Sequence, residues 1–156
     1  MDKFVFNEGG DLQPVGLICC SQRKFKSFFI DGLNHPNRNA LWENYKIFIA
    51  CLKEKIFEYH FVVWMFGSYV TNANPGDIDI AIWVNKEDKL QLNNKDVVEL
   101  VYSIAKETFG IHLQYILEKP ENNQLLRNAP DDLKDWLTGR NNNRGFIQLD
   151  YKKHKQ

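Results

Sequence analysis

The sequence predicts an α/β (α+β) fold in which a mixed β-sheet is covered by helices packed against it. Two runs of strand-forming apolar residues lie at the centre of the chain, at 61–66 and 77–84, and two further strand patterns follow at 111–117 and 146–151. Segments of helical periodicity lie before, between and after them. Because helices and strands alternate along the chain, we expect both faces of the sheet to be covered.

Length and composition predict one domain that spans 1–156. The 156 residues are 44% hydrophobic and 13% aromatic, which is enough to bury a sizeable core. Within the domain, we expect residues 1–20 to form an extended arm with turns at its Gly and Pro positions. Residues 152–156 should form a basic C-terminal tail.

Two helices are predicted before the first central strand. Ser21 is suited to cap a short helix that reaches Ile30 and ends at Gly32. From 38 to 57, apolar residues recur at helical spacing, which predicts a long amphipathic helix. Its apolar stripe consists of Leu41, Tyr45, Phe48, Leu52 and Ile56.

Two more helical segments are predicted after the second central strand. Asn93-Asn94 should cap a helix that ends at Gly110, directly before the strand at 111–117. Residues 121–138 should be helical with a break at Pro130. All four tryptophans lie in apolar patterns and are predicted core residues: Trp42, Trp64, Trp83 and Trp136. Trp83 also shares strand parity with Asp77 and Asp79, so it could instead line a site.

Two carboxylates open the strand at 77–84. Because side chains alternate along a strand, Asp77 and Asp79 point to the same face. Neighbouring carboxylates repel each other unless one is protonated or a cation lies between them. Oxygen ligands of this kind suit Mg²⁺ or Mn²⁺. The pair therefore predicts a divalent metal site.

A Gly-Ser turn precedes that strand, with eight residues between Ser68 and Asp77. Gly67 lets the backbone approach a ligand without a Cβ clash, and the backbone N–H groups and hydroxyl of such a turn suit phosphate oxygens. Combined with the two carboxylates, the turn predicts a nucleoside-triphosphate site.

The segments 66–71 and 75–79 resemble the signature of the nucleotidyltransferase (polymerase-beta-like) superfamily, and in particular a family of small, mostly uncharacterised bacterial proteins of that fold. The resemblance implies that Asp77 and Asp79 are both the metal ligands and the catalytic carboxylates. The residues it places near the nucleotide are Gly67, Ser68, Tyr69 and Thr71. For Tyr69, packing in the core is an alternative to stacking on a base.

The implied reaction is the transfer of a nucleoside monophosphate from an NTP to a hydroxyl, with Mg²⁺ or Mn²⁺. The acceptor could be a protein, a transfer-RNA end or a small molecule. Compact members of the superfamily often belong to toxin–antitoxin or phage-defence pairs, so the resemblance also implies a protein partner. The formal net charge is zero, which argues against a DNA-binding groove. With no secretory signal or membrane-spanning apolar run, we expect a cytoplasmic protein without membrane association.

The third acidic position of the superfamily is not matched. Catalytic members usually carry another carboxylate on a later strand, and 111–117 contains none. His112, Gln114 and Glu118 share strand parity there and are the candidate replacements, although a single strand histidine is more often structural. A catalytically inactive module that binds nucleotide or a partner protein therefore remains the alternative function.

Basic residues that could neutralise phosphate form two groups, which in sequence are typical of solvated faces. They are Arg23, Lys24 and Lys26 near the N-terminus, and Arg140, Arg144 and the C-terminal lysines.

Overall fold

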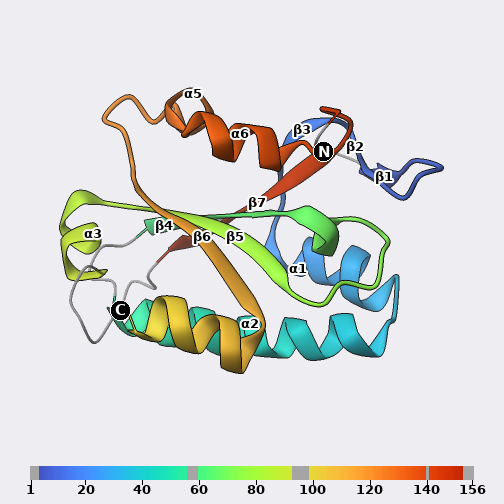
Figure 1. The fold of residues 1–156 in the computed structure, drawn as a ribbon, viewed down its shortest axis with the longest axis horizontal. Coiled ribbons are helices and arrows are strands. Elements are labelled where there is room, and N and C mark those ends of the chain that lie inside the picture. The colour runs from blue at the N-terminus through green and yellow to red at the C-terminus, as the bar shows by residue number, and fades with distance from the viewer. Residues whose placement is uncertain (1–3, 56–59, 93–98, 140, 153–156) are drawn as a thin grey trace.

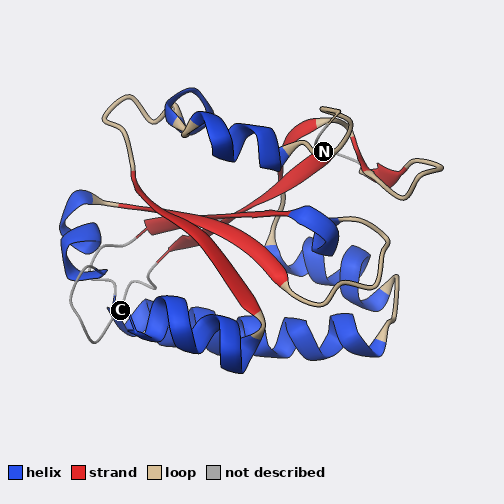
Figure 2. Cartoon of the chain, in the orientation of Figure 1, coloured by secondary structure: helices blue, strands red, loops and turns tan. Residues whose placement is uncertain are grey.

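A five-stranded mixed sheet forms the centre of the molecule, which confirms the predicted α/β class (Figures 1 and 2). The computed structural model describes residues 4–55, 60–92, 99–139 and 141–152. The outer pairs β3–β7 and β5–β6 are parallel, whereas β4 is antiparallel to both of its neighbours. In sheet order, the strands are β3 (Gly16–Cys19), β7 (Gly145–Lys152), β4 (His60–Phe66), β5 (Ile78–Val84) and β6 (Ile111–Glu118).

Helices cover both faces of the sheet, with α2 on one side and α6 on the other (Figure 1). The larger layer contains α1 (Gln22–Phe25), the π-type segments η1 (Lys26–Asp31) and η3 (Glu99–Phe109), and α2 (Pro36–Lys55). The smaller layer contains α5 (Leu125–Asn128) and α6 (Asp131–Leu137), and α3 (Lys86–Leu92) follows β5.

Strand alternation divides the core into two clusters. Ile80 and Ile82 of β5 face the α2 layer, whereas Ala81 and Trp83 face the α6 layer. Since both faces of these strands are buried, the sequences of β4 and β5 are nearly continuous apolar runs.

The predicted extended N-terminal arm forms short β-strands along the part described. β1 (Val5–Phe6) and β2 (Leu12–Gln13) form an antiparallel hairpin, and β3 then joins the edge of the main sheet. Leu12 is fully buried in the core. The arm is therefore packed against the domain along the part described.

Most predicted element boundaries agree with the structure. The Ser21 hydroxyl accepts a hydrogen bond from the Lys24 amide at 3.0 Å, and so caps α1. Gly110 has φ +70 directly after η3, and α6 begins after Pro130. The predicted cap at Asn93-Asn94 lies outside the described residues, as do Arg140 and positions 153–156 of the tail.

The prediction that every tryptophan is a core residue is wrong for Trp136. Trp42, Trp64 and Trp83 are at most 2% exposed, so Trp83 lies in the core and not in an open site, whereas Trp136 is 47% exposed on α6. A short helix over a sheet buries one stripe, and here that stripe contains Leu133 and Leu137. None of the helices that the structure describes has the length and apolar character needed to span a bilayer.

Candidate functional site

Three potential metal ligands meet at the start of β5. Asp77 lies directly before the strand, Asp79 lies within it, and His112 on β6 is the register partner of Asp79. The ligand atoms of all three residues lie within 4.8 Å of one another, and all three side chains are partly buried. Nδ1 of His112 is 3.2 Å from Oδ1 of Asp79. Two carboxylates and an imidazole at this spacing can bind a divalent cation.

The charge balance of this cluster favours a bound cation. Burial is the main cause that raises the pKa of Asp79 above its ordinary value of 3.8, and the charge of Asp77 raises it further. His112 and Gln114 oppose the shift through hydrogen bonds, and His112 also through its charge. A divalent ion would compensate the burial and the repulsion together.

A β-bulge decides which residue of β6 completes the cluster. The register runs from Ile80 opposite Leu113 to Ala81 opposite Tyr115, which leaves Gln114 as the extra residue. Gln114 Nε2 lies 2.9 Å from Nδ1 of His112. Beyond the bulge the parity is reversed, so the prediction that Glu118 shares the face of His112 is wrong. Glu118 is exposed and pairs with Val84 at the far end of β5.

The predicted turn and the predicted acid are in contact. Gly67 has φ +78, and a Cβ added to it would lie 2.5 Å from Oδ2 of Asp79. Only glycine combines this backbone conformation with so close an approach. Gly67 begins η2 (Gly67–Val70), a single turn between β4 and the loop that leads to Asp77.

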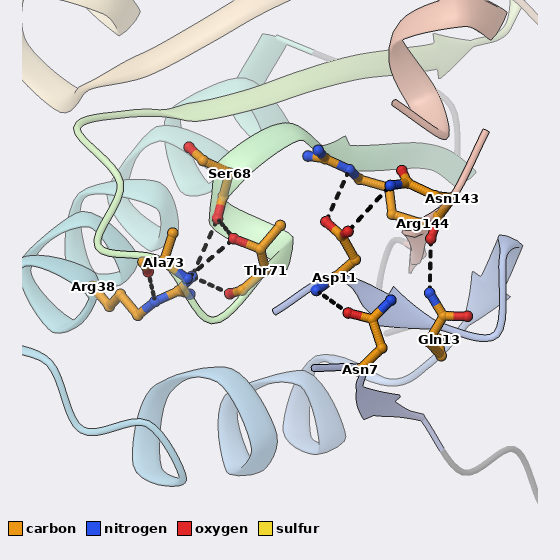
Figure 3. Close-up of polar contacts among 9 residues, drawn as sticks. All are labelled: Asn7, Asp11, Gln13, Arg38, Ser68, Thr71, Ala73, Asn143 and Arg144. Carbon is orange, nitrogen blue, oxygen red and sulfur yellow. Dashed lines mark hydrogen bonds and ion pairs between the residues drawn. The ribbon is translucent and has the colours of Figure 1, made fainter. Parts of the chain in front are cut away.

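Arg38 holds this turn in place from beneath (Figure 3). Its buried guanidinium donates to the carbonyl oxygens of Tyr69 at 2.8 Å, Ala73 at 3.0 Å and Ser68 at 3.3 Å, and also to that of Thr71. Burial lowers the pKa of Arg38. One side chain thus satisfies four carbonyl groups of the turn.

We did not identify Arg38 from the sequence, although a signal was present. It lies three residues before Leu41 and therefore on the apolar stripe of α2, where a charged residue needs a buried partner.

Two of the four residues assigned to the nucleotide support the turn instead. Tyr69 is fully buried, and its hydroxyl donates to the Arg38 carbonyl at 2.8 Å, so the core alternative describes it correctly. The Thr71 hydroxyl donates to the Ser68 carbonyl at 2.7 Å and accepts from the Ala73 amide at 3.1 Å. Ser68 is partly buried, and its side chain points away from Arg38 in Figure 3.

A cleft of about 890 Å³ opens beside the cluster, between the end of the sheet and the α6 layer. Gly67, Asp79 and Gln114 line it on the sheet side. Opposite them, Lys134 and Trp136 come from α6, and Arg144 lies directly before β7. The cleft therefore combines carboxylate, cationic and aromatic groups, of which Lys134 and Trp136 were not among the predicted site residues.

The N-terminal arm links the turn to the opposite wall (Figure 3). A carboxylate oxygen of Asp11 lies 3.5 Å from Nε of Arg144, and the other accepts from the side-chain Nδ2 of Asn143 at 3.3 Å. On the turn side, the Asn72 N–H donates to the Gly10 carbonyl at 3.1 Å. The arm thus connects the loop after the turn with the segment before β7.

Comparison with known proteins identifies a family for the chain. A family model described as a family of unknown function (DUF6932) matches residues 4–150, nearly the whole chain. No curated protein and no solved structure matches the chain. The matched residues include the cluster of Asp77, Asp79 and His112, the turn and the cleft.

Proposed function

The chain belongs to DUF6932, a family whose function is unknown, and from the site geometry we propose that it is a metal-dependent nucleotidyltransferase. In this proposal the protein transfers a nucleoside monophosphate from an NTP to a hydroxyl group. The single observation that carries it is the contact of the Gly67 turn with Asp79, within a cluster that also contains Asp77 and His112.

The reaction requires positioning and charge stabilisation more than covalent chemistry. An acceptor oxygen attacks the α-phosphorus, the bond between the α-phosphorus and the bridging oxygen breaks, pyrophosphate leaves, and the hydroxyl proton passes to solvent or to a carboxylate. A divalent ion held by Asp77, Asp79 and His112 would supply Lewis-acid stabilisation of the phosphate oxygens. The glycine turn would bring backbone N–H groups to the same oxygens.

The far wall of the cleft suits the rest of the nucleotide. Lys134 and Arg144 supply positive charge for the β- and γ-phosphates. Trp136 supplies an exposed aromatic face on which a base of any identity could stack. Because Asp135 also lines the cleft, cations and carboxylates are balanced there, which favours a single nucleotide over a long polyanion.

The proposal includes three kinds of hydroxyl acceptor: a protein side chain, a transfer-RNA end or a small molecule. A cytoplasmic setting and a protein partner, as in a toxin–antitoxin or phage-defence pair, are part of the same proposal and rest on the resemblance of the 66–79 segment.

The test is transfer of label from α-³²P-NTPs to components of a cell extract in the presence of Mg²⁺ or Mn²⁺. We expect a labelled product with α-³²P-NTP and none with γ-³²P-NTP, because pyrophosphate carries the γ-phosphate away. Asp77→Asn and Asp79→Asn should abolish labelling, whereas Asp31→Asn, which changes an exposed carboxylate, should not. Labelling that is absent, or equal in all variants, would overturn the proposal.

The inactive alternative is favoured by one observation, the imidazole at the position where a third carboxylate is expected. Such a protein would bind NTP without turnover. Metal-dependent thermal stabilisation by NTP, lost in Asp77→Asn and accompanied by no label transfer, would support this second function.

A further inference from the structure

The third ligand of the cluster has a different chemistry from the other two. Asp77 and Asp79 offer carboxylate oxygens, whereas His112 offers an imidazole nitrogen. The two carboxylates carry the charge that one divalent ion balances. Mg²⁺ prefers oxygen ligands, whereas imidazole binds first-row transition ions well.

The distances fit a direct bond from the imidazole to the ion. Adjacent ligand atoms about 2.1 Å from an octahedral ion lie roughly 3.0 Å apart, and those of a tetrahedral ion roughly 3.4 Å apart. The separation of 3.2 Å between Nδ1 of His112 and Oδ1 of Asp79 lies between these values. The limit of 4.8 Å for the whole cluster also accommodates opposite ligands of one ion.

Gln114 contacts the same imidazole from the neighbouring position. Its side-chain nitrogen lies 2.9 Å from Nδ1 and 3.2 Å from Nε2 of His112. This contact restrains the orientation of the ring beside Asp79, as hydrogen-bond partners of metal-binding histidines do. The β-bulge is the feature that brings Gln114 to this position.

We propose that Asp77, Asp79 and His112 bind one first-row transition ion, such as Mn²⁺ or Co²⁺, in preference to Mg²⁺, and that Nδ1 of His112 provides the selectivity. As the choice of metal for the transfer reaction, the inference rests on the proposed function. Metal binding itself is measured without nucleotide.

The experiment uses the metal-free full chain and three variants. Mn²⁺ binding is followed by the electron paramagnetic resonance signal of free Mn²⁺, and Mg²⁺ affinity by competition. We expect one Mn²⁺ per chain, bound at least about tenfold more tightly than Mg²⁺. His112→Ala should weaken Mn²⁺ binding about tenfold or more and Mg²⁺ binding much less. His112→Asp should improve Mg²⁺ binding and reduce the preference, whereas His35→Ala, which changes an exposed histidine, should change neither.

Cobalt gives a second readout, since a nitrogen ligand changes the visible absorption bands of bound Co²⁺. We expect the bands of the wild type and of His112→Asp to differ. A wild type that prefers Mg²⁺, or a Mn²⁺-to-Mg²⁺ ratio that is the same in the wild type, His112→Ala and His112→Asp, would overturn the inference. In that case His112 only donates a hydrogen bond to Asp79.

Failure of this inference can be distinguished from failure of the proposed function. Label transfer with Mg²⁺ at an equal rate in the wild type and His112→Ala would leave the nucleotidyltransferase and remove the metal preference. Selective Mn²⁺ binding without any label transfer would keep the metal preference and remove the nucleotidyltransferase. Thermal unfolding of each variant checks that it is folded.

Discussion

The carboxylate of Asp79 occupies space that any side chain at position 67 would need, because a Cβ there would lie 2.5 Å from Oδ2. The turn and the Asp79 carboxylate therefore depend on each other. Gly67→Ala should weaken Mn²⁺ and NTP binding about tenfold or more, since the carboxylate must move. It should also lower the free energy of unfolding by about 1–2 kcal/mol, the cost of a left-handed conformation for alanine. Isothermal titration and urea unfolding measure the two effects.

The same loop offers a matched control. Gly76 does not have a left-handed φ, and a Cβ there would have no neighbour within 4 Å. Gly76→Ala should leave affinity and stability nearly unchanged. Equal effects of the two substitutions would show that the contact of Gly67 with Asp79 has no special role.

The pKa of Asp79 predicts a conflict between binding and stability. Burial first, and Asp77 second, raise this pKa above 3.8, so the folded state holds the proton more tightly than the unfolded chain does. Ionisation near neutral pH therefore costs folding free energy. Asp79→Asn should raise the free energy of unfolding of the metal-free protein at pH 7.5. The gain should be complete above the raised pKa and shrink as the pH falls toward 3.8, where both states become protonated.

Chemical unfolding across this pH range in the presence of a chelator gives the measurement. Asp31→Asn is the control, because Asp31 forms only an exposed ion pair with Lys26. Saturating Mn²⁺ should stabilise the wild type and not Asp79→Asn. If Asp79→Asn is the less stable protein at pH 7.5, the hydrogen bonds of Asp79 with His112 and Gln114 outweigh its burial.

Arg38 makes the turn dependent on a residue of α2. Arg38→Met would leave the carbonyl oxygens of Tyr69, Thr71 and Ala73 without the guanidinium donor, whereas the Ser68 carbonyl would keep the Thr71 hydroxyl. We expect a loss of at least about 3 kcal/mol of unfolding free energy. Arg38→Lys keeps the charge but not the planar fork, so its loss should be intermediate. Urea unfolding beside the exposed Arg23→Met tests this. An Arg38→Met protein within about 1 kcal/mol of the wild type would contradict it.

Sequence periodicity predicted the parts of the molecule that local patterns control. The strands at 61–66 and 77–84 were found because both of their faces are apolar, and the helix around Leu41 because its stripe repeats regularly. Asp77 and Asp79 were expected to share a face, since parity over two residues of one strand needs no tertiary information.

Features that depend on tertiary contacts could not be obtained in this way. The bulge at Gln114 is a mismatch between β5 and β6, so it is invisible in β6 alone, yet it removes Glu118 from the site and retains His112. The exposure of Trp136, and the choice between the two roles predicted for Tyr69, also depend on packing. Tyr69 is buried and bonded to Arg38, whereas Trp136 lies outside the buried stripe of α6.

Trp136 is the one tryptophan of the chain whose fluorescence should respond to a ligand in the cleft. Trp42, Trp64 and Trp83 are at most 2% exposed, whereas Trp136 is 47% exposed and lines the cleft. Acrylamide should therefore quench mainly Trp136, and NTP should reduce that quenching by covering the indole.

Substitutions of Trp136 test this prediction. Trp136→Phe should keep NTP binding but lose the fluorescence response. Trp136→Ala should weaken NTP binding at least about fivefold, as expected when a stacked base loses its aromatic partner. Leu126→Ala, which removes another exposed apolar side chain from the neighbouring α5, is the control and should change neither property. If NTP binds to Trp136→Ala with the affinity of the wild type, the base lies elsewhere, and the α6 wall contributes only its charges.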